Sequence, residues 1–456
     1  MKTDQEKRTL YKNIIVVALP IILQNLLDAA VSSADVLMLN FVGQTAISAT
    51  SLASQYSSIY FMFLYGIGTG VAMLCAQYWG KGDKRTVEKV EGLGLRFALL
   101  IGLIFCLCSM LIPTWMMKLY TDDTELITLG TVYLRILAPG MLFWGISAVY
   151  TSVLRCIGRV TTSTVIDAIA LLSNVCLNAV FIFGLFGIPK MGVAGVALAT
   201  LISRSIQLIC CIVVSVKWAE VKLRLTHIFE RHPLLMKDFV SMALPAIGND
   251  VIWGVGFSMY TLILGHLGSD AVAANSIVSV VRNLGCVLCY GIASASGIIV
   301  GQILGRGEIE KAKTTSHTLL RLTIAAGVIG GLMVFALSPV VIRYAKLSER
   351  ALDYLQFMLY INTYYVMGTA INSLLIAGIF RAGGDSKFGF WCDTIDMWVY
   401  AVPLGLLAAF VFQLPVKVVY FLLCTDEFVK WPWVFKNYFS YKWARNITRN
   451  DIDADA

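Results

Sequence analysis

Charged residues are scarce in this sequence. They make up 14% of its 456 residues, whereas soluble globular domains carry about 25%. Histidine is scarcer still, with four residues that form no cluster, so we expect no metal site. The HExxH, GxSxG and P-loop motifs are absent from the sequence, which argues against the enzyme classes that these motifs mark. We therefore expect a protein that is not an enzyme, uses no cofactor and does not fold as a soluble domain.

Hydrophobic residues dominate instead, at 58% of the chain and with a mean hydropathy of +0.76. A transmembrane helix needs about 20 mostly apolar residues, and runs of this kind recur along the whole chain. The last run is the least hydrophobic, because it contains Asp426, Glu427 and Lys430. The sequence predicts an all-α polytopic membrane protein with twelve transmembrane helices, at residues 14–40, 52–79, 94–115, 127–153, 162–186, 192–217, 239–265, 271–303, 319–342, 354–380, 388–411 and 414–436.

The basic residues are distributed unevenly between the segments that connect these spans. With the N-terminus placed inside, 27 of the 36 Lys and Arg residues fall in inner segments, as the positive-inside rule requires of cytoplasmic loops. We therefore expect a multi-pass protein of the cell (plasma) membrane, surrounded by the lipid bilayer, with both termini in the cytoplasm. These loops account for the net charge of +8, so we expect no nucleic-acid partner.

An internal repeat divides the chain. Residues Ala18–Pro20 recur as Ala243–Pro245, an offset of 225 residues, and further matches follow at the same offset. Because each copy contains six spans, both copies enter the membrane from the same side and are parallel repeats. We expect two pseudo-symmetric six-helix lobes, residues 1–225 and residues 226–456 with a short cytoplasmic tail. In transporters built from such repeats, the substrate binds between the halves near the midplane, and the halves rock to alternate its access.

Polar residues form a stripe along the first span. Gln24, Asn25, Asp28, Ser32 and Asp35 follow the spacing of one helix face. An ionisable group at the centre of a membrane helix costs about 2.5–3.5 kcal/mol on insertion scales, so it marks a functional site by default. A buried Asp favours its protonated form and can also bind a cation as a carboxylate. We predict that Asp35 and Asp28 bind the coupling ion, a proton or sodium; helix–helix hydrogen bonding is the alternative role.

Two asparagines in the fifth span are further candidates for the coupling-ion site. Asn174 and Asn178 lie one helical turn apart and offer amide donors and acceptors toward the first-span acids. The alternative is again a hydrogen bond between helices.

The repeat also identifies the positions in the C-terminal half that correspond to the polar stripe. At the offset of 225, Asp250, Trp253 and Tyr260 correspond to Asn25, Asp28 and Asp35. We predict that Asn25, Asp250, Trp253 and Tyr260 contact the substrate. Asp250, the single deep acid of its span, can pair with a cationic substrate or, as a structural ion pair, with Arg282 or Arg204, and the sequence leaves these partners open.

A set of short motifs covers essentially the whole chain. It includes Ser33–Asp35, the GxGTG run Gly66–Gly70, Leu154–Gly158, the glycine- and alanine-rich run Met191–Thr200, and Arg381–Asp385. Together these motifs resemble those of the multidrug and toxic compound extrusion (MATE) transporters.

The resemblance implies antiport, in which entry of protons or sodium drives the export of small organic cations or amphipathic drugs. It matches the family's first-span acid to Asp35 and a seventh-span acid of some members to Asp250. Some members have a second acid in the fifth span, where this chain has Asn178, and others have one in the tenth span, where this chain offers only Asn362 and Asn372. The identity of the coupling ion therefore stays open.

A flippase for a lipid-linked saccharide, from the same superfamily, is the alternative. Such a protein would favour a wide cationic cavity for a pyrophosphate group. Arg204 and Arg282, inside the sixth and eighth spans, are too few to require such a cavity, whereas acids dominate the first span. We therefore favour the antiporter.

Overall fold

The computed structural model describes residues 4–39, 42–218, 220–223, 225–230, 232–345 and 347–450, without the side chains of residues 4–7, 9, 32–37, 39 and 225. Within these ranges every regular element is helical. The α-helices are α1 Asp4–Leu39, α2 Gln44–Lys81, α3 Lys84–Leu111, α4 Pro113–Lys118, α5 Thr124–Cys156, α6 Val160–Phe183, α7 Gly192–Lys217, α8 Pro233–His266, α9 Ser269–Gly305, α10 Ile309–Tyr344, α11 Glu349–Asn372, α12 Ser386–Ile395, α13 Val402–Leu406, α14 Val416–Leu423, α15 Asp426–Val429 and α16 Trp431–Ser440. Two short 3₁₀ turns, η1 Leu185–Gly187 and η2 Leu225–Ile228, and three π-helical segments, η3 Ser373–Phe380, η4 Asp396–Ala401 and η5 Leu407–Val411, complete them.

The predicted twelve-span fold is confirmed. Eleven helical segments of the described residues are long and apolar enough to cross a membrane, and they include Glu349–Phe380 and Ser386–Val411, which continue through π-helical turns. The twelfth segment, α14 to α16, is broken into short helices. Its break has a chemical cause, because charged side chains interrupt the apolar run and Pro432, in the first turn of α16, has no N–H to continue a preceding helix.

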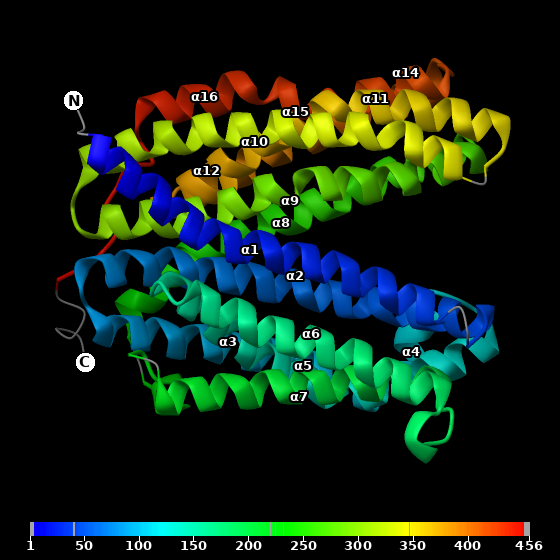
Figure 1. Cartoon of the computed structure of the whole chain (residues 1–456), viewed down its shortest axis with the longest axis horizontal. Coiled ribbons are helices and arrows are strands. Elements are labelled where there is room, and N and C mark those ends of the chain that lie inside the picture. The colour runs from blue at the N-terminus through cyan, green and yellow to red at the C-terminus, as the bar shows by residue number, and fades with distance from the viewer. Residues whose placement is uncertain are drawn as a thin grey trace. The chain divides into compact units, whose positions relative to one another are not determined.

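The helices form two compact units. The N-unit consists of Leu23–Val240 together with Arg449–Ala456, and the C-unit consists of Met1–Ile22 together with Ser241–Thr448. Figure 1 shows each unit as a bundle of helices that run alongside one another. The first half of α1 is therefore part of the C-unit, where Ile14 lies in the same apolar core as Val300 and Leu374.

Glycine lets helices of the C-unit approach closely. A Cβ atom added to Gly330 of α10 would overlap the carbonyl oxygen of Gly285 on α9, and one added to Gly331 would overlap the carbonyl oxygen of Thr363 on α11. Close backbone approach of this kind is how helices pack in a membrane, where burial of apolar surface from water does not drive them together.

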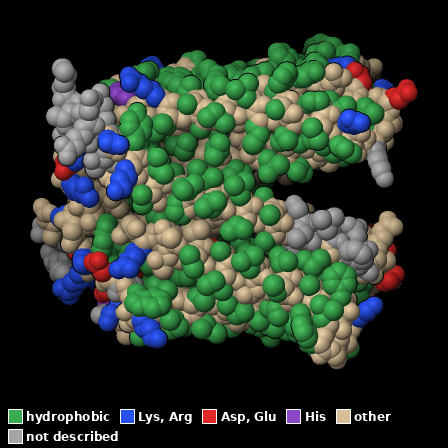
Figure 2. Space-filling model, in the orientation of Figure 1, with side chains coloured by type: hydrophobic (Ala, Val, Ile, Leu, Met, Phe, Trp, Pro, Cys, Tyr) green, Lys and Arg blue, Asp and Glu red, His purple; other side chains and the backbone are tan. Residues whose placement is uncertain are grey.

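The outer surface is apolar along the helices. Figure 2 shows, on the face in view, hydrophobic side chains over the middle of the helices and Lys and Arg toward their ends. Exposed apolar residues recur at helical spacing, as with Leu103, Leu107 and Leu111 of α3, which are 44–74% exposed. Large contiguous apolar surfaces are unfavourable in water but match lipid chains. The chain is therefore a multi-pass membrane protein, as predicted.

Candidate functional site

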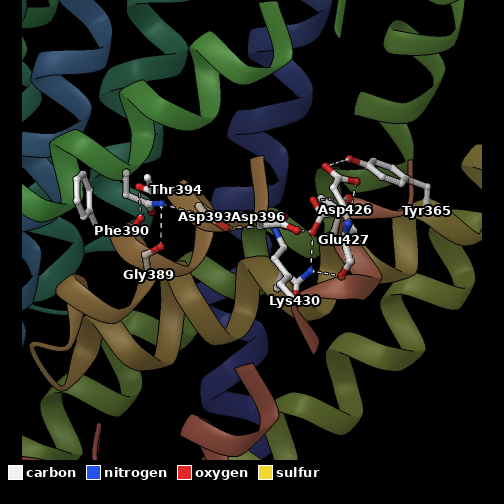
Figure 3. Close-up of polar contacts among 12 residues, drawn as sticks. Tyr365, Gly389, Phe390, Asp393, Thr394, Asp396, Asp426, Glu427 and Lys430 are labelled. Carbon is white, nitrogen blue, oxygen red and sulfur yellow. Dashed lines mark hydrogen bonds and ion pairs between the residues drawn. The ribbon is translucent and has the colours of Figure 1, made fainter. Parts of the chain in front are cut away.

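The C-unit contains a cluster of buried charged residues, which we call the acid–lysine cluster. Its members are Asp393, Asp396, Asp426, Glu427 and Lys430, all between 0% and 5% exposed. Asp393 and Asp396 come from the eleventh span, at the end of α12 and the start of η4, and the other three from α15 and the residue that follows it. Figure 3 shows Asp393, Asp396 and Glu427 around Lys430, with Asp426 turned toward Tyr365.

Lys430 is the cation of this cluster. Its Nζ lies 3.1 Å from Asp393 Oδ1, 3.2 Å from Glu427 Oε2 and 3.5 Å from Asp396 Oδ2. A buried ammonium is costly unless it is paired, and here three carboxylates surround it.

Polar groups of other helices hydrogen-bond most of the carboxylates. Asp393 Oδ2 accepts a hydrogen bond from Asn249 Nδ2 of α8 at 2.6 Å. Glu427 accepts hydrogen bonds from Asn372 Nδ2 and, at 3.3 Å, from Thr369 Oγ1, both on α11. The cluster is therefore tied to α8 and α11 as well as to its own two segments.

Asp426 is bonded on a different side. Its Oδ2 accepts hydrogen bonds from the hydroxyl of Tyr260 on α8 at 2.9 Å and from that of Tyr365 on α11 at 3.4 Å. Its Oδ1 accepts the backbone N–H of Glu427 at 2.8 Å. Each oxygen of this fully buried carboxylate thus has a donor.

Asp396 is the exception. It is 0% exposed, and among the described residues neither of its carboxylate oxygens has a hydrogen-bond partner. The cation closest to it in the described part of the chain is Lys430, at a distance that is long for a hydrogen bond. It also stands at the first position of the π-helical segment η4, and π-bulges occur frequently at functional sites.

A second pair of charges adjoins the cluster through Asn249. Arg381 Nη2 donates to Asn249 Oδ1 and to Asp250 Oδ1, both at 2.7 Å. The sequence had suggested Arg282 or Arg204 as the ion-pair partner of Asp250, and this was wrong: Asp250 pairs with Arg381. The error has a plain cause, since these residues lie 131 positions apart and only packing of α8 against the end of the tenth span brings them together.

A cavity of about 210 Å³ lies beside the cluster within the C-unit. Tyr260 and Tyr365 line it and also donate to Asp426, so their phenol groups separate the cavity from the acids. The guanidinium of Arg282 lies in its wall, 5.2 Å from the ring centre of Phe257 and 5.8 Å from that of Tyr365. The full lining is Phe257, Tyr260, Thr261, Leu264, Asn275, Ser279, Arg282, Tyr365, Tyr420, Leu423 and Cys424.

Two of the predicted substrate residues lie near this cavity. Tyr260 lines it, and the Trp253 ring, 38% exposed, packs 4.4 Å from that of Phe257, which also lines it. Asp250 is bonded to Arg381 instead, and Asn25 lies in the N-unit, where it is half-buried.

The N-unit holds the remaining predicted ion-site residues. The side chain of Asp35 lies outside the described residues. Asp28 is exposed and lies within electrostatic range of Asp167, Arg204 and Arg155. The polar stripe does engage an acid, because Gln24 Nε2 donates to Asp167 Oδ2 at 2.7 Å.

Asp167 also accepts a hydrogen bond from Gln207 Nε2 at 2.7 Å. Gln207 Oε1 in turn accepts from Arg204 Nη1 at 3.1 Å, and the Arg204 guanidinium lies 4.1 Å from the centre of the Trp144 ring. Arg204 is therefore held by an amide and an aromatic face on the N-unit's α5 and α7.

Asn174 and Asn178 bond to each other, as helical neighbours. Asn178 Nδ2 donates to Asn174 Oδ1 at 3.2 Å, and Asn174 Nδ2 donates to Thr200 Oγ1 of α7 at 3.3 Å. Both asparagines are buried. The group presents amide and hydroxyl oxygens, which are the ligands that hard cations prefer.

The acid–lysine cluster is the part of the site that sequence reasoning missed. In the sequence analysis, Asp426, Glu427 and Lys430 were considered only as charged residues that make the twelfth span less hydrophobic. A usable signal existed, because Glu427 and Lys430 on one hand and Asp393 and Asp396 on the other are spaced i, i+3, on one helix face, within apolar segments.

Comparisons with known proteins agree with this architecture. A family model described as MatE matches residues 20–180 and 245–407, two segments whose starts are separated by the 225 residues of the internal repeat. The chain is 22% identical over 431 residues to the uncharacterized transporter YisQ of Bacillus subtilis, with 93% of each chain covered. It is 24% identical over 420 residues to the probable multidrug resistance protein NorM of Thermotoga maritima, covering 90% of this chain and 88% of that one.

Solved structures share the fold. A transporter of the MOP superfamily from Pyrococcus furiosus superposes with a TM-score of 0.86 at 18% sequence identity, over 95% of this chain and 97% of the other. An outward-facing multidrug resistance MATE family transporter superposes with a TM-score of 0.83 at the same identity and coverage. At this level of identity the likeness shows the arrangement of the helices.

Proposed function

Because the chain belongs to the MatE family of membrane transporters, we propose that it is a secondary active multidrug antiporter. Entry of protons or sodium ions drives the export of cationic or amphipathic small molecules, by rocking of two lobes that alternates access to the substrate. Its relatives include probable multidrug resistance proteins, which supports export of drugs as the activity.

The observation that carries this proposal is the acid–lysine cluster. Four carboxylic acids and one lysine inside the membrane-spanning helices serve no purpose in lipid packing, and each is expensive to keep there. An antiporter needs such groups, because a coupling ion has to bind inside the protein and leave again. Ionisable residues in transporters commonly mark these ion pathways.

The coupling ion also has a candidate site in the N-unit, at Asp35, Asp28, Asn174 and Asn178. The paired amides and the Thr200 hydroxyl suit a sodium ion, whereas an acid in the first span suits a proton. Both chemistries are available to the N-unit, so the choice of ion is left to experiment.

Substrate binding is assigned to Trp253, Tyr260, Asn25 and Asp250. The rings of Trp253 and Phe257 offer aromatic faces to a small organic cation. Asp250 would contact the substrate through Oδ2, which is buried and has no hydrogen-bond partner among the described residues. Its other oxygen, Oδ1, pairs with Arg381.

We place the protein in the cell membrane with both termini in the cytoplasm, on the distribution of Lys and Arg between the connecting segments. Export from the cytoplasm is then driven by an inward gradient of protons or sodium.

The test uses the purified full-length chain in proteoliposomes, with ethidium as the probe. Ethidium transport is followed by fluorescence while a pH gradient, a sodium gradient or neither is imposed. We expect transport to follow the pH gradient. Transport that follows sodium alone and ignores pH would move the coupling to sodium, and transport that ignores both gradients would reject antiport.

A further inference from the structure

The acid–lysine cluster has more acids than its cation can neutralise. Asp393, Asp396, Asp426 and Glu427 would carry four negative charges against the single positive charge of Lys430. The neighbouring ion pair, Arg381 with Asp250, is balanced by itself. Unpaired charge is strongly unfavourable in a buried site, so the cluster has to hold protons on some of its carboxyl groups.

The hydrogen bonds distinguish the four acids. Asp393, Asp426 and Glu427 each accept hydrogen bonds from neighbouring donors, and such donors stabilise an ionised carboxylate. Asp396 accepts none among the described residues, although it is 0% exposed. Its side chain is aimed at Lys430, as Figure 3 shows. Of the four acids, Asp396 therefore gains most from taking up a proton.

We propose that Asp396 is a proton-binding site of the transporter in the C-unit, and that Lys430 compensates its charge when the proton leaves. In the structure, Lys430 lies closer to Asp393 and Glu427 than to Asp396, which is the arrangement expected when Asp396 is protonated. Loss of the proton leaves a carboxylate that attracts the ammonium. The step is a simple exchange of one proton at one carboxyl oxygen, and it rests on the proposed antiport.

Sodium does not suit this position. The Nζ of Lys430 already lies among Asp393, Asp396 and Glu427, at 3.1–3.5 Å from each. A metal ion bound by the same oxygens would have to displace the ammonium or lie against it, and like charges at such a distance repel. The cluster can therefore change its net charge only by gaining or losing a proton.

Several ionisable groups lie around Asp396. They are Asp393 and Cys392 of its own span, Asp426, Glu427 and Lys430 of the twelfth span, and Tyr260 of α8. Tyr260 and Tyr365 also line the cavity, so their hydroxyls link the cavity wall to Asp426 of the cluster.

The test is infrared difference spectroscopy of the full-length protein in lipid during a pH titration. A protonated buried carboxyl gives its own C=O stretching band, and this readout needs no substrate. We expect Asp396→Asn to lose one such band and Asp353→Asn to keep every band. Asp353 is a matched control, because it pairs with Lys417 at 2.7 Å in the same unit but is exposed. An unchanged band in Asp396→Asn would overturn the proposal.

A second variant guards against misfolding. Asp396→Glu keeps a titratable carboxyl, and we expect it to shift the frequency and the midpoint of the band; an unshifted band overturns the proposal. Ethidium transport by the same wild-type preparation is measured separately. Wild-type transport that ignores ion gradients contradicts the proposed antiport, whereas gradient-driven transport with an unchanged band in Asp396→Asn contradicts the Asp396 site alone.

Discussion

The hydroxyl of Tyr260 donates a hydrogen bond to Oδ2 of Asp426, 2.9 Å away and 166 residues further along the chain. Tyr260 belongs to the seventh span and lines the cavity of the C-unit, while Asp426 belongs to the broken twelfth span. The Tyr260 side chain therefore lines the cavity and also contacts the acid–lysine cluster through its hydroxyl. Any change at Tyr260 is expected to act on both.

Replacing Tyr260 with Phe removes the shorter of the two phenol hydrogen bonds to Asp426. We expect the variant to be less stable by about 1–3 kcal/mol, the range for leaving a buried acceptor without its donor. Tyr365, at 3.4 Å, is too distant to replace it fully. The measurement is the apparent Tm in detergent, with Tyr364→Phe as control, since Tyr364 is 40% exposed. Equal shifts in the two variants would contradict the assigned bond.

Substitutions at Arg381 and Asp250 test whether the ion pair between them stabilises the fold. Arg381→Gln leaves a buried carboxylate without its cation, and we expect a loss of about 3–5 kcal/mol. The double variant with Asp250→Asn should lose less than the sum of the single changes, because both charges are then absent. Apparent Tm values for the four proteins give the coupling. Losses that simply add in the double variant would contradict a structural ion pair between Arg381 and Asp250.

Gly383 is required by the close passage of the C-terminal segment. A Cβ at this position would overlap the carbonyl oxygen of Trp443, whose ring is fully buried. We expect Gly383→Ala to cost at least about 1–3 kcal/mol, as overpacking of a core does. Gly297→Ala is the control in the same unit, because its nearest neighbour would be at 3.5 Å, an ordinary contact. Comparable expression and Tm of the two variants would show that the backbone at Trp443 does not require glycine at position 383.

Glu230, in the segment between α7 and α8, gives a pH-dependent contribution. Hydrogen bonds with His227, at 2.8 Å, and with His232, at 3.1 Å, hold the pKa of Glu230 below its ordinary value of 4.5. A carboxyl with a lowered pKa stabilises the fold above the unfolded pKa and loses this effect as the pH falls through the folded pKa.

We therefore expect Glu230→Gln to melt below the wild type at pH above the ordinary pKa of 4.5, with the difference closing as the pH falls below it. The effect should be small, because the side chain is 41% exposed and solvent screens it. Melting curves across this pH range, with the exposed Glu310→Gln as control, check the sign. A difference that grows toward acid pH would exclude the mechanism.

Asp35 tests the N-unit ion site. We expect Asp35→Asn to abolish drug efflux in cells while leaving expression intact, because an amide cannot exchange a proton or carry the charge that binds sodium. Efflux of ethidium and drug resistance are the measurements, and Asp122→Asn, an exposed acid of the same unit, is the control. Full resistance in cells with Asp35→Asn would exclude a coupling role for this residue.

The sequence by itself determined the membrane class, the twelve spans and the duplication. These features are local or periodic, because about 20 apolar residues in succession mark a span wherever they occur. The positions that the repeat aligns, such as Pro20 and Pro245, can be read without any knowledge of contacts. The same holds for the motif of Gly383, although its reason, the passage of Trp443, cannot be seen in the sequence.

Only the tertiary structure decided which charges meet. Asp393 and Lys430 lie 37 residues apart, Asn249 and Arg381 132 apart, and nothing in hydropathy relates them. Hydropathy counts a charged residue as a defect of its span, so Glu427 and Lys430 seemed to weaken the twelfth helix. In the fold, these charged residues pack against the eleventh span, α8 and α11, whose polar and charged groups pair with them. The physical reason is that a membrane interior tolerates a charge only where another group compensates it, and that group comes from elsewhere in the fold.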